Sequence, residues 1–241
     1  MQILNLQNPF EGPVFYLPVT TSTMAIAKAN PVHGALVITG MQTDGRGRIA
    51  GRTWESPSDK NLLLTLTIRQ DTLQVPLTSA SIRTALSIVR LLESEFTIHA
   101  CIKWPNDVLV RRRKISGILC ESNGGYLYIG VGVNCNQKVF PEFQNRKATS
   151  ISIETARDID TPGLLAPFLP IWKDCLYELK QYELPGVANP KLCNIGRQVE
   201  VFEGDPRSGA LIRGTAEGIG EAGELCLRQK NGKIRSIYSG E

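Results

Sequence analysis

The sequence predicts an α+β fold, in which antiparallel hairpins packed by helices form a main domain and a small β-barrel follows it. Three observations support this class: strand-length apolar runs between turn residues, one long stretch with helical periodicity, and four short strand-like runs near the end of the chain. Two prolines and a glycine at 184–190 predict a linker. The expected division is therefore a main domain at 1–185 and a small β domain at 191–241.

The first part of the main domain is expected to alternate strands with helices. A strand at 14–19 leads into a short helix that Ser22 can cap, and a buried strand at 34–40 follows. A second apolar run at 61–69 predicts another buried strand. Apolar residues then recur with helical period, which predicts a helix over 75–92.

The second part is expected to be a meander of antiparallel strands. Turn sequences such as WPND and NGG separate its predicted strands at 98–103, 108–110, 115–121 and 126–134. A loop with at most a short helix should follow at 138–161, and Pro167 and Pro170 should start or kink the next helix. The strands of the small barrel are predicted at 198–202, 211–217, 225–229 and 233–238.

The composition indicates a globular, cytoplasmic protein whose positive charge is concentrated at two places. The chain has 27 Lys and Arg against 23 Asp and Glu, a net charge of +4, with basic clusters at 46–52 and 111–114. Such focused charge suits a small anionic ligand better than a nucleic-acid surface. No leader or membrane-length apolar run is found, so no membrane association is expected. The six cysteines lack zinc or disulfide spacing and are expected to be thiols in a reducing compartment.

A glycine–arginine loop is the first candidate binding element. In QTDGRGRIAGRTW, the glycines Gly45, Gly47 and Gly51 alternate with the arginines Arg46, Arg48 and Arg52. Glycines let the backbone approach a phosphate closely, and guanidinium groups neutralise its charge. A solvated basic turn is the alternative, but the loop runs directly into a predicted strand and so has a rigid support.

Four motifs, in order, resemble the catalytic domain of biotin protein ligases: QTDGRGRIAGRTW, KWPND, KISGILCE and GVGVN. The last β segment resembles their SH3-like domain, so the resemblance extends from about residue 14 to the end. It implies a main domain like that of class II aminoacyl-tRNA synthetases. It also implies an enzyme that uses biotin, ATP and Mg²⁺ to make biotinyl-5'-AMP, and then biotinylates a lysine of a biotin carboxyl carrier domain of the acetyl-CoA carboxylase type.

The resemblance assigns catalytic roles to five residues. Arg46 and Arg48 would clamp phosphates, and Lys114 would reach the biotin carboxylate and the α-phosphate. From the residues alone, Lys114 is a surface lysine in a basic hairpin. Lys103 and Asp107 would support Mg-ATP and the incoming amine, or would form a local ion pair that closes the WPND turn.

The resemblance also implies two sets of ligand contacts. Biotin contacts are expected from Ser22, Thr23, Gln42, Gly45, Arg46, Lys114, Gly117 and Leu119. ATP contacts are expected from Arg46, Arg48, Trp54, Asn106, Asp107, Lys114 and Asn134. Trp54 would stack on adenine or lie in the core, and Ser22 would contact biotin or cap its helix. No firm metal ligand is expected beyond Mg²⁺ bound with ATP.

The loop departs from the family pattern GRGRxGR at one place. Ile49 and Ala50 stand between Arg48 and Gly51, where the family usually has one residue, so the role of Arg52 stays open. Met24 also stands where the family often has asparagine, so one polar contact to biotin is missing or is supplied elsewhere.

Other functions remain open at this stage. A lipoate or octanoate ligase of the same fold is one alternative. A lipoyl or octanoyl transferase of that fold is another: it would use a catalytic cysteine or lysine, and Cys120 and Cys135 lie near the predicted site. A non-enzymatic nucleic-acid-binding module could use the two arginine clusters. A DNA-binding repressor is not expected, because only 19 residues precede Thr20, too few for three helices. The resemblance is compatible with a homodimer through the central sheet.

Overall fold

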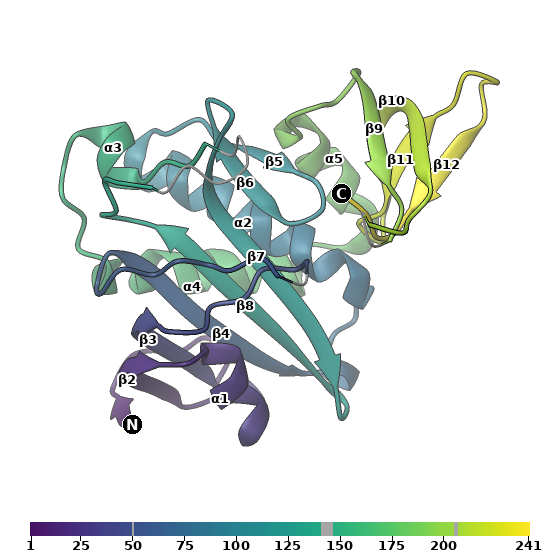
Figure 1. Ribbon diagram of the computed structural model, residues 1–241. Helices are drawn as coiled ribbons and strands as arrows, with labels where there is room; N and C mark the ends of the chain where they lie inside the picture. Colours follow the sequence, from purple (N-terminus) through teal and green to yellow (C-terminus); the bar gives the residue numbers. More distant parts are fainter. Residues whose placement is uncertain (50, 141–146, 205–206) are drawn as a thin grey trace.

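The computed structural model describes residues 1–49, 51–140, 147–204 and 207–241 (Figure 1). Its main sheet has eight strands in the order β1-β2-β3-β4-β8-β7-β6-β5. Their bounds are β1 (Gln2–Leu4), β2 (Val14–Thr20), β3 (Leu36–Gln42), β4 (Asn61–Arg69), β5 (Cys101–Lys103), β6 (Asp107–Val110), β7 (Arg113–Asn123) and β8 (Tyr126–Asn134). Strands β2 and β3 pair in parallel across the helix α1 (Thr23–Ala29), and the other neighbouring strands are antiparallel.

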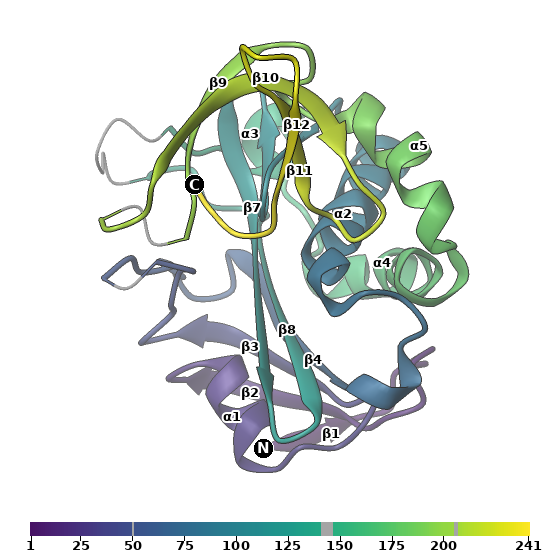
Figure 2. The same cartoon turned by 90° about the vertical axis from the view of Figure 1, so that its right-hand side faces the viewer.

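Helices cover both faces of this sheet (Figure 2). The long helix α2 (Ala80–Phe96) and the helix α4 (Leu165–Lys173) lie on one face, and α1 lies on the other. The shorter helices are α3 (Ile151–Thr155) and α5 (Leu184–Ala188). Short 3₁₀ turns lie at Gln70–Thr72, Leu77–Ser79, Pro162–Leu164, Gln181–Glu183 and Asn189–Lys191, and a π-helical turn, Asp174–Glu178, continues α4.

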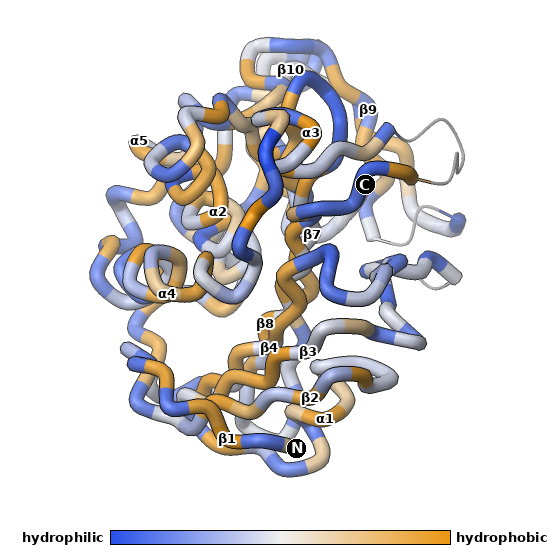
Figure 3. The backbone as a smooth tube through the Cα atoms, turned by 90° about the vertical axis from the view of Figure 1, so that its left-hand side faces the viewer, coloured by the Kyte–Doolittle hydropathy of each residue, from blue (hydrophilic) through white to orange (hydrophobic). Residues whose placement is uncertain are grey.

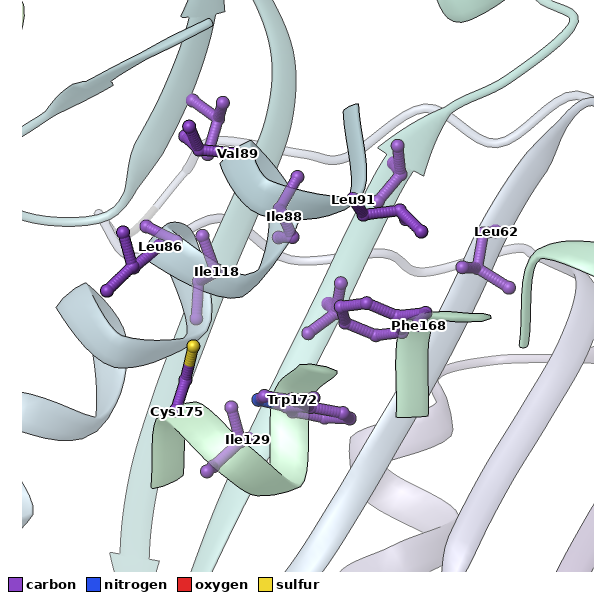
Figure 4. Close-up of a cluster of buried hydrophobic side chains, with 14 of the residues drawn as sticks. Leu62, Leu86, Ile88, Val89, Leu91, Ile118, Ile129, Phe168, Trp172 and Cys175 are labelled. Carbon is purple, nitrogen blue, oxygen red and sulfur yellow. The ribbon is translucent and has the colours of Figure 1, made fainter. Parts of the chain in front are cut away.

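The burial of both sheet faces explains the continuous apolar runs of the sequence. Apolar colour follows the central strands β3, β4 and β8 (Figure 3). Along β3, Leu36 and Ile38 belong to the large core beneath α2 and α4, whereas Val37 belongs to a smaller core beneath α1. In the large core, Phe168 and Trp172 of α4 stack with ring centres 5.1 Å apart (Figure 4).

A second sheet of four antiparallel strands follows the main domain in the order β12-β11-β10-β9. Its strands are β9 (Gln198–Phe202), β10 (Leu211–Ile219), β11 (Leu225–Arg228) and β12 (Ile234–Ile237). This sheet has its own small core. It is held to the main domain by hydrogen bonds from Trp104 Nε1 to the Gly223 carbonyl, 3.0 Å, and from Thr78 Oγ1 to the Ala222 carbonyl, 2.8 Å.

Most predicted elements are present, several of them with the predicted bounds. The strands at 61–69, 126–134 and 198–202 agree with β4, β8 and β9. The helix predicted at 75–92 begins five residues later, because 3₁₀ geometry occupies Leu77–Ser79. Within the described ranges, no helix has the length and apolar character needed to cross a membrane.

The linker predicted at 184–190 is wrong. These residues form α5 and the start of the following 3₁₀ turn, and the side chains of Leu184 and Ala188 are fully buried. The prolines that suggested a linker, Pro185 and Pro190, are the second residues of these two helical turns and lie in their first turns. Proline is tolerated there, because a first-turn N–H has no intrahelical acceptor to lose.

The expectation that all six cysteines are thiols is also wrong. Cys101 of β5 and Cys193 form a disulfide across 92 residues of sequence, with their Cα atoms 5.1 Å apart. The chain near Cys193 runs beside β5, since Leu192 bridges to Ile102 and the Cys193 N–H donates to the Ile102 carbonyl at 3.0 Å. The other four cysteines are free.

Candidate active site

Two cavities, of about 470 Å³ and 390 Å³, adjoin at the glycine–arginine loop. Residues that line both are Gly47, Arg48, Trp54, Asn106 and Lys114. The larger cavity is also lined by Lys103, Asp107 and Asn134, and the smaller one by Ser22, Thr23, Gln42, Arg46, Gly117 and Leu119. The structure thus brings all the candidate residues to these cavities except Gly45, which belongs to the same loop but lines neither of them.

Lys114 stands at the boundary between the cavities. Its Nζ lies 2.6 Å from Asp107 Oδ1 and 5.4 Å from the centre of the Trp54 ring. Two backbone hydrogen bonds join Lys114 to the segment at 147–149. The Lys114 N–H donates to the Lys147 carbonyl, and the Thr149 N–H donates to the Lys114 carbonyl, each at 2.9 Å. The Lys114 side chain is therefore about one-third exposed and is held at this boundary by its ion pair with Asp107.

Asp107 pairs with Lys114 across the β6–β7 ladder. Lys103 is opposite Asp107 in the β5–β6 ladder, but the ion pair found for Asp107 in the described residues is the one with Lys114. The local pair that would close the WPND turn is thus not formed. The Lys103 side chain is exposed and lines the larger cavity.

Two glycines form a floor beneath Trp54. Gly117 of β7 and Gly132 of β8 are direct partners in the sheet. A Cβ on Gly132 would lie 2.6 Å from Trp54 Cε2, and a Cβ on Gly117 would lie 3.0 Å from both Lys114 and Trp54. The indole is half-buried on this floor, and its Nε1 is buried without an acceptor in the described part of the chain. Trp54 therefore separates the two cavities rather than filling the core.

The loop folds back on itself to reach Trp54. The Gly47 N–H donates to the Arg52 carbonyl at 2.8 Å, and the Trp54 N–H donates to the Gly45 carbonyl at 2.9 Å. A Cβ on Gly45 would lie 2.4 Å from the Trp54 carbonyl oxygen. Gly45 is thus required for the loop conformation. Ala50, the extra residue of the loop, lies outside the described residues.

The three arginines of the loop have different surroundings. Arg46 is 73% exposed and pairs with Asp44 at 2.9 Å. Arg48 donates to the Gly240 carbonyl at 2.6 Å, and Arg52 Nη1 lies 2.6 Å from Glu241 Oε1. Partial burial lowers the pKa of Arg48, and the carboxylates of Glu241 and Asp107 oppose that shift.

Sequence reasoning missed Glu241. It is 189 residues from Arg52, and no local signal connects the two. The structure gives Arg52, whose role stayed open, a carboxylate partner at the edge of the larger cavity.

The smaller cavity is organised around Thr23 and Gln42. The Thr23 N–H and Oγ1 donate to Gln42 Oε1 at 2.8 and 3.1 Å, and Thr23 Oγ1 lies 2.8 Å from Thr65 Oγ1. Ser22 stands at the N-cap position of α1, but its side chain makes no capping hydrogen bond. Thr65 was missed, although Thr65 and Thr67 on alternate positions of an otherwise apolar strand were a signal.

Two asparagines of the site are tied to the backbone. Asn106 Nδ2 donates to the Ile118 carbonyl at 2.9 Å, and the Ile118 N–H donates to the Asn106 carbonyl at the same distance. Asn134 Nδ2 donates to the Thr149 carbonyl at 2.9 Å. Both asparagines line the larger cavity, and these bonds fix the segments around it.

The structure disfavours cysteine chemistry in this site. Burial raises the pKa of both Cys120 and Cys135 to about 12, so these thiols are protonated at neutral pH and are poor nucleophiles. The described residues that line the two cavities include no cysteine. In the described ranges, no group of three or more His, Cys, Asp or Glu could hold a metal ion by itself.

The chain is similar to known biotin ligases along most of its length. Residues 16–136 match the biotin/lipoate A/B protein ligase family, and residues 195–241 match the biotin protein ligase C-terminal domain. The biotin–[acetyl-CoA-carboxylase] ligase of Paracoccus denitrificans is 31% identical over 89% of this chain and 92% of its own. The bifunctional ligase/repressor BirA of Bacillus subtilis is 29% identical over 95% of this chain and 73% of its own.

A solved structure has the same fold. The biotin protein ligase of Aquifex aeolicus, in complex with biotin and ATP, superposes with a TM-score of 0.83 at 29% identity and covers 95% of this chain and 96% of its own. The match includes both the main sheet and the four-stranded sheet that follows it. Together with the site geometry, these similarities establish that the chain belongs to the biotin/lipoate A/B protein ligase family.

Proposed function

We propose that the protein is an ATP-dependent ligase that attaches biotin to a lysine of a carrier protein through biotinyl-5'-AMP. The observation that carries this proposal is the meeting of two cavities at Lys114 and Trp54. Activation of a carboxylic acid by ATP needs a site for the acid and a site for the nucleotide, with a cation where they meet. The biotin- and ATP-bound relative from Aquifex aeolicus supports this interpretation.

Biotin occupies the smaller cavity in this proposal. Its ureido ring needs both donors and acceptors, which Ser22, Thr23 and Gln42 offer at the end of the cavity near α1. Its carboxylate then points to Lys114. Leu119 and the glycine floor line the space between these two ends.

ATP occupies the larger cavity, with the face of Trp54 available to adenine and Arg48 available to the phosphates. A biotin carboxylate oxygen bonds to the α-phosphorus, and the bond from that phosphorus to pyrophosphate breaks. Lys114 and Arg48 stabilise the negative charge that builds on the phosphoryl oxygens. Asp107 positions the Lys114 ammonium group by the 2.6 Å contact. With ATP bound, Asp107 would be the carboxylate available to Mg²⁺, which would offset the negative charge of the phosphates, since Mg²⁺ commonly uses one or two carboxylates plus phosphates.

The second step transfers biotin to the carrier. The neutral amine of the acceptor lysine bonds to the acyl carbon of biotinyl-AMP, AMP leaves with the electrons of the broken C–O bond, and the amine loses a proton. Asp107 and Lys103 border the cavity from which this amine would approach. The carrier is proposed to be a biotin carboxyl carrier domain of the acetyl-CoA carboxylase type. We also propose that residues 1–185 form the catalytic domain and that residues 191–241 form an SH3-like domain, whose last residue borders the larger cavity.

A labelling experiment tests this function. The purified protein is incubated with ATP, Mg²⁺, an apo carrier domain and either radiolabelled biotin or radiolabelled lipoate. We expect the carrier to be labelled by biotin and not by lipoate, and expect no label when the acceptor lysine is replaced by arginine. Labelling by lipoate alone would assign the chain to the lipoate branch of the family instead.

A further inference from the structure

The hairpin turn between β6 and β7 has an unfavourable backbone for its sequence. It consists of two residues, Arg111 and Arg112, both with positive φ, 48° and 66°. Two-residue turns of this kind favour Asn-Gly, because most L-residues are destabilised in left-handed conformations. Here two arginines occupy both positions.

The two side chains add little to the stability of the fold. Arg111 is 80% exposed and lies 3.7 Å from Glu154, whose buried carboxylate already pairs with Arg113 at 2.6 Å. Arg112 is exposed, and no ion pair forms with it in the described part of the chain. Neither packing nor ion pairing therefore explains why these residues occupy the turn.

The turn lies next to the catalytic end of β7. Arg112 is two residues from Lys114, whose backbone N–H donates to the carbonyl of Lys147. The side chain of Lys147 is also exposed. Arg111, Arg112 and Lys147, which we call the basic rim, thus place three exposed cations beside the residue at which the two cavities meet.

We propose that the basic rim docks an acidic surface of the protein that presents the acceptor lysine. This inference rests on the proposed function and adds the surface that recognises the second substrate. Exposed charges at the edge of an interface mainly accelerate association and make it salt-dependent. A backbone strain retained beside a reactive site also points to a functional reason for the residues that cause it. A nucleic acid fits less well, because affinity for it grows with the number of phosphates neutralised and the basic rim offers only three cations.

The test compares the two half-reactions in the full chain. In the double variant Arg111→Asn, Arg112→Gly, the turn receives its favoured residues and loses both charges. We expect KM for an apo biotin carboxyl carrier domain to rise about tenfold at low salt, with much weaker salt dependence than in the parent. We expect biotinyl-AMP formation without carrier, measured by pyrophosphate release, to change less than about twofold, and Tm to rise, because Asn-Gly tolerates the left-handed turn better than two arginines do.

Two matched variants separate the local charge from other causes. Arg111→Lys, Arg112→Lys keeps the charge and the strained turn, so the parent KM should be largely retained. Lys230→Ser, Lys233→Ser removes two exposed charges from the β11–β12 hairpin, away from Lys114, and should leave KM unchanged.

Distinct outcomes would overturn the proposal. An unchanged carrier KM in the Asn-Gly variant, or an equal rise in the Lys230 and Lys233 variant, would show that the basic rim is not the docking surface. If the Asn-Gly variant instead lost binding to a short DNA duplex while its carrier KM stayed unchanged, the basic rim would be a nucleic-acid site and the proposal would be wrong. Absence of biotinyl-AMP in the parent protein would instead reject the proposed function.

Discussion

Lys114 lines both cavities, and its replacement is the most direct test of a single residue. The Lys114→Ala variant loses the cation at the site where phosphoryl charge builds and leaves Asp107 without its partner. Loss of one such preorganised group commonly lowers rates by about 10²–10³. We expect a fall of that size in biotinyl-AMP formation, measured by pyrophosphate release, with a much smaller change in Tm. A loss below about fivefold would contradict the assigned role.

Gly132 offers a second test, which depends on shape instead of charge. A methyl group at Gly132 would meet the Trp54 ring at 2.6 Å, so Gly132→Ala should displace the indole from its floor. We expect kcat/KM for ATP to fall by at least about tenfold, because the boundary between the cavities is lost.

Gly130→Ala is the matched control for this prediction. It adds the same methyl group two residues away on β8, where the nearest atom is the flexible Met24 side chain at 3.1 Å. We expect it to be nearly neutral toward ATP. Equal effects of the two alanine variants would argue against the floor, and so would unchanged tryptophan fluorescence in Gly132→Ala.

At the element scale, sequence patterns predicted the main-sheet strands well because their burial is local information. Strand β4 is a continuous buried run, and its limits at Asn61 and Arg69 follow from the polar residues around it. The linker at 184–190 failed because proline has two meanings, a helix breaker and a first-turn residue, and the choice depends on whether Leu184 and Ala188 find a core.

The candidate site was predictable where motifs are contiguous and not where distant segments meet. Lys114, Trp54 and the glycines were identified from short motifs, and the structure gathers them. The contacts of Arg52 with Glu241 and of Thr23 with Thr65 depend on tertiary packing, so no local pattern fixes them. The disulfide was missed for the same reason.

This disulfide gives a testable prediction about the element β5. It joins β5 to the chain just before the second sheet and closes a long loop, so it restricts the unfolded state. Such cross-links typically contribute about 2–4 kcal/mol, which corresponds to roughly 4–16 °C in Tm for a chain of this size. We expect Cys101→Ser, Cys193→Ser to lower Tm within that range.

Reductant and a cysteine control make the comparison specific. Dithiothreitol should lower the Tm of the parent but not of the double serine variant, and Cys226→Ser, which removes a half-buried free thiol, should keep the dithiothreitol response. Titration of six thiols in the denatured, unreduced parent would show that the disulfide does not form.

At the scale of the whole molecule, the second sheet contributes to the active site as well as to stability. The segment after β12 pairs with the end of β9, through hydrogen bonds in both directions between Phe202 and Glu241. This pairing delivers the Gly240 carbonyl to Arg48 and the Glu241 carboxylate to Arg52, from a sheet whose small core packs against Trp104. The loop that borders both cavities is therefore fastened by the small sheet.

Glu241→Gln tests this fastening. The variant retains hydrogen-bonding capacity but loses the ion pair with Arg52. It also loses the negative charge of Glu241, which partly offsets the lowering of the Arg48 pKa by burial. If the small sheet holds the loop over the intermediate, biotinyl-AMP should escape several-fold faster, measured by filtration of the enzyme-bound adenylate. The rate of adenylate formation should change less, because Lys114 and Asp107 are untouched.

Glu203→Gln removes a comparable ion pair of the same sheet, with Arg235, and should leave adenylate retention unchanged. The exchange Arg52→Glu, Glu241→Arg should recover part of the retention lost in Glu241→Gln, since it restores an ion pair of opposite polarity across the same contact. If Glu241→Gln and the parent retain the adenylate equally, the contact between the sheet and the loop has only a structural role.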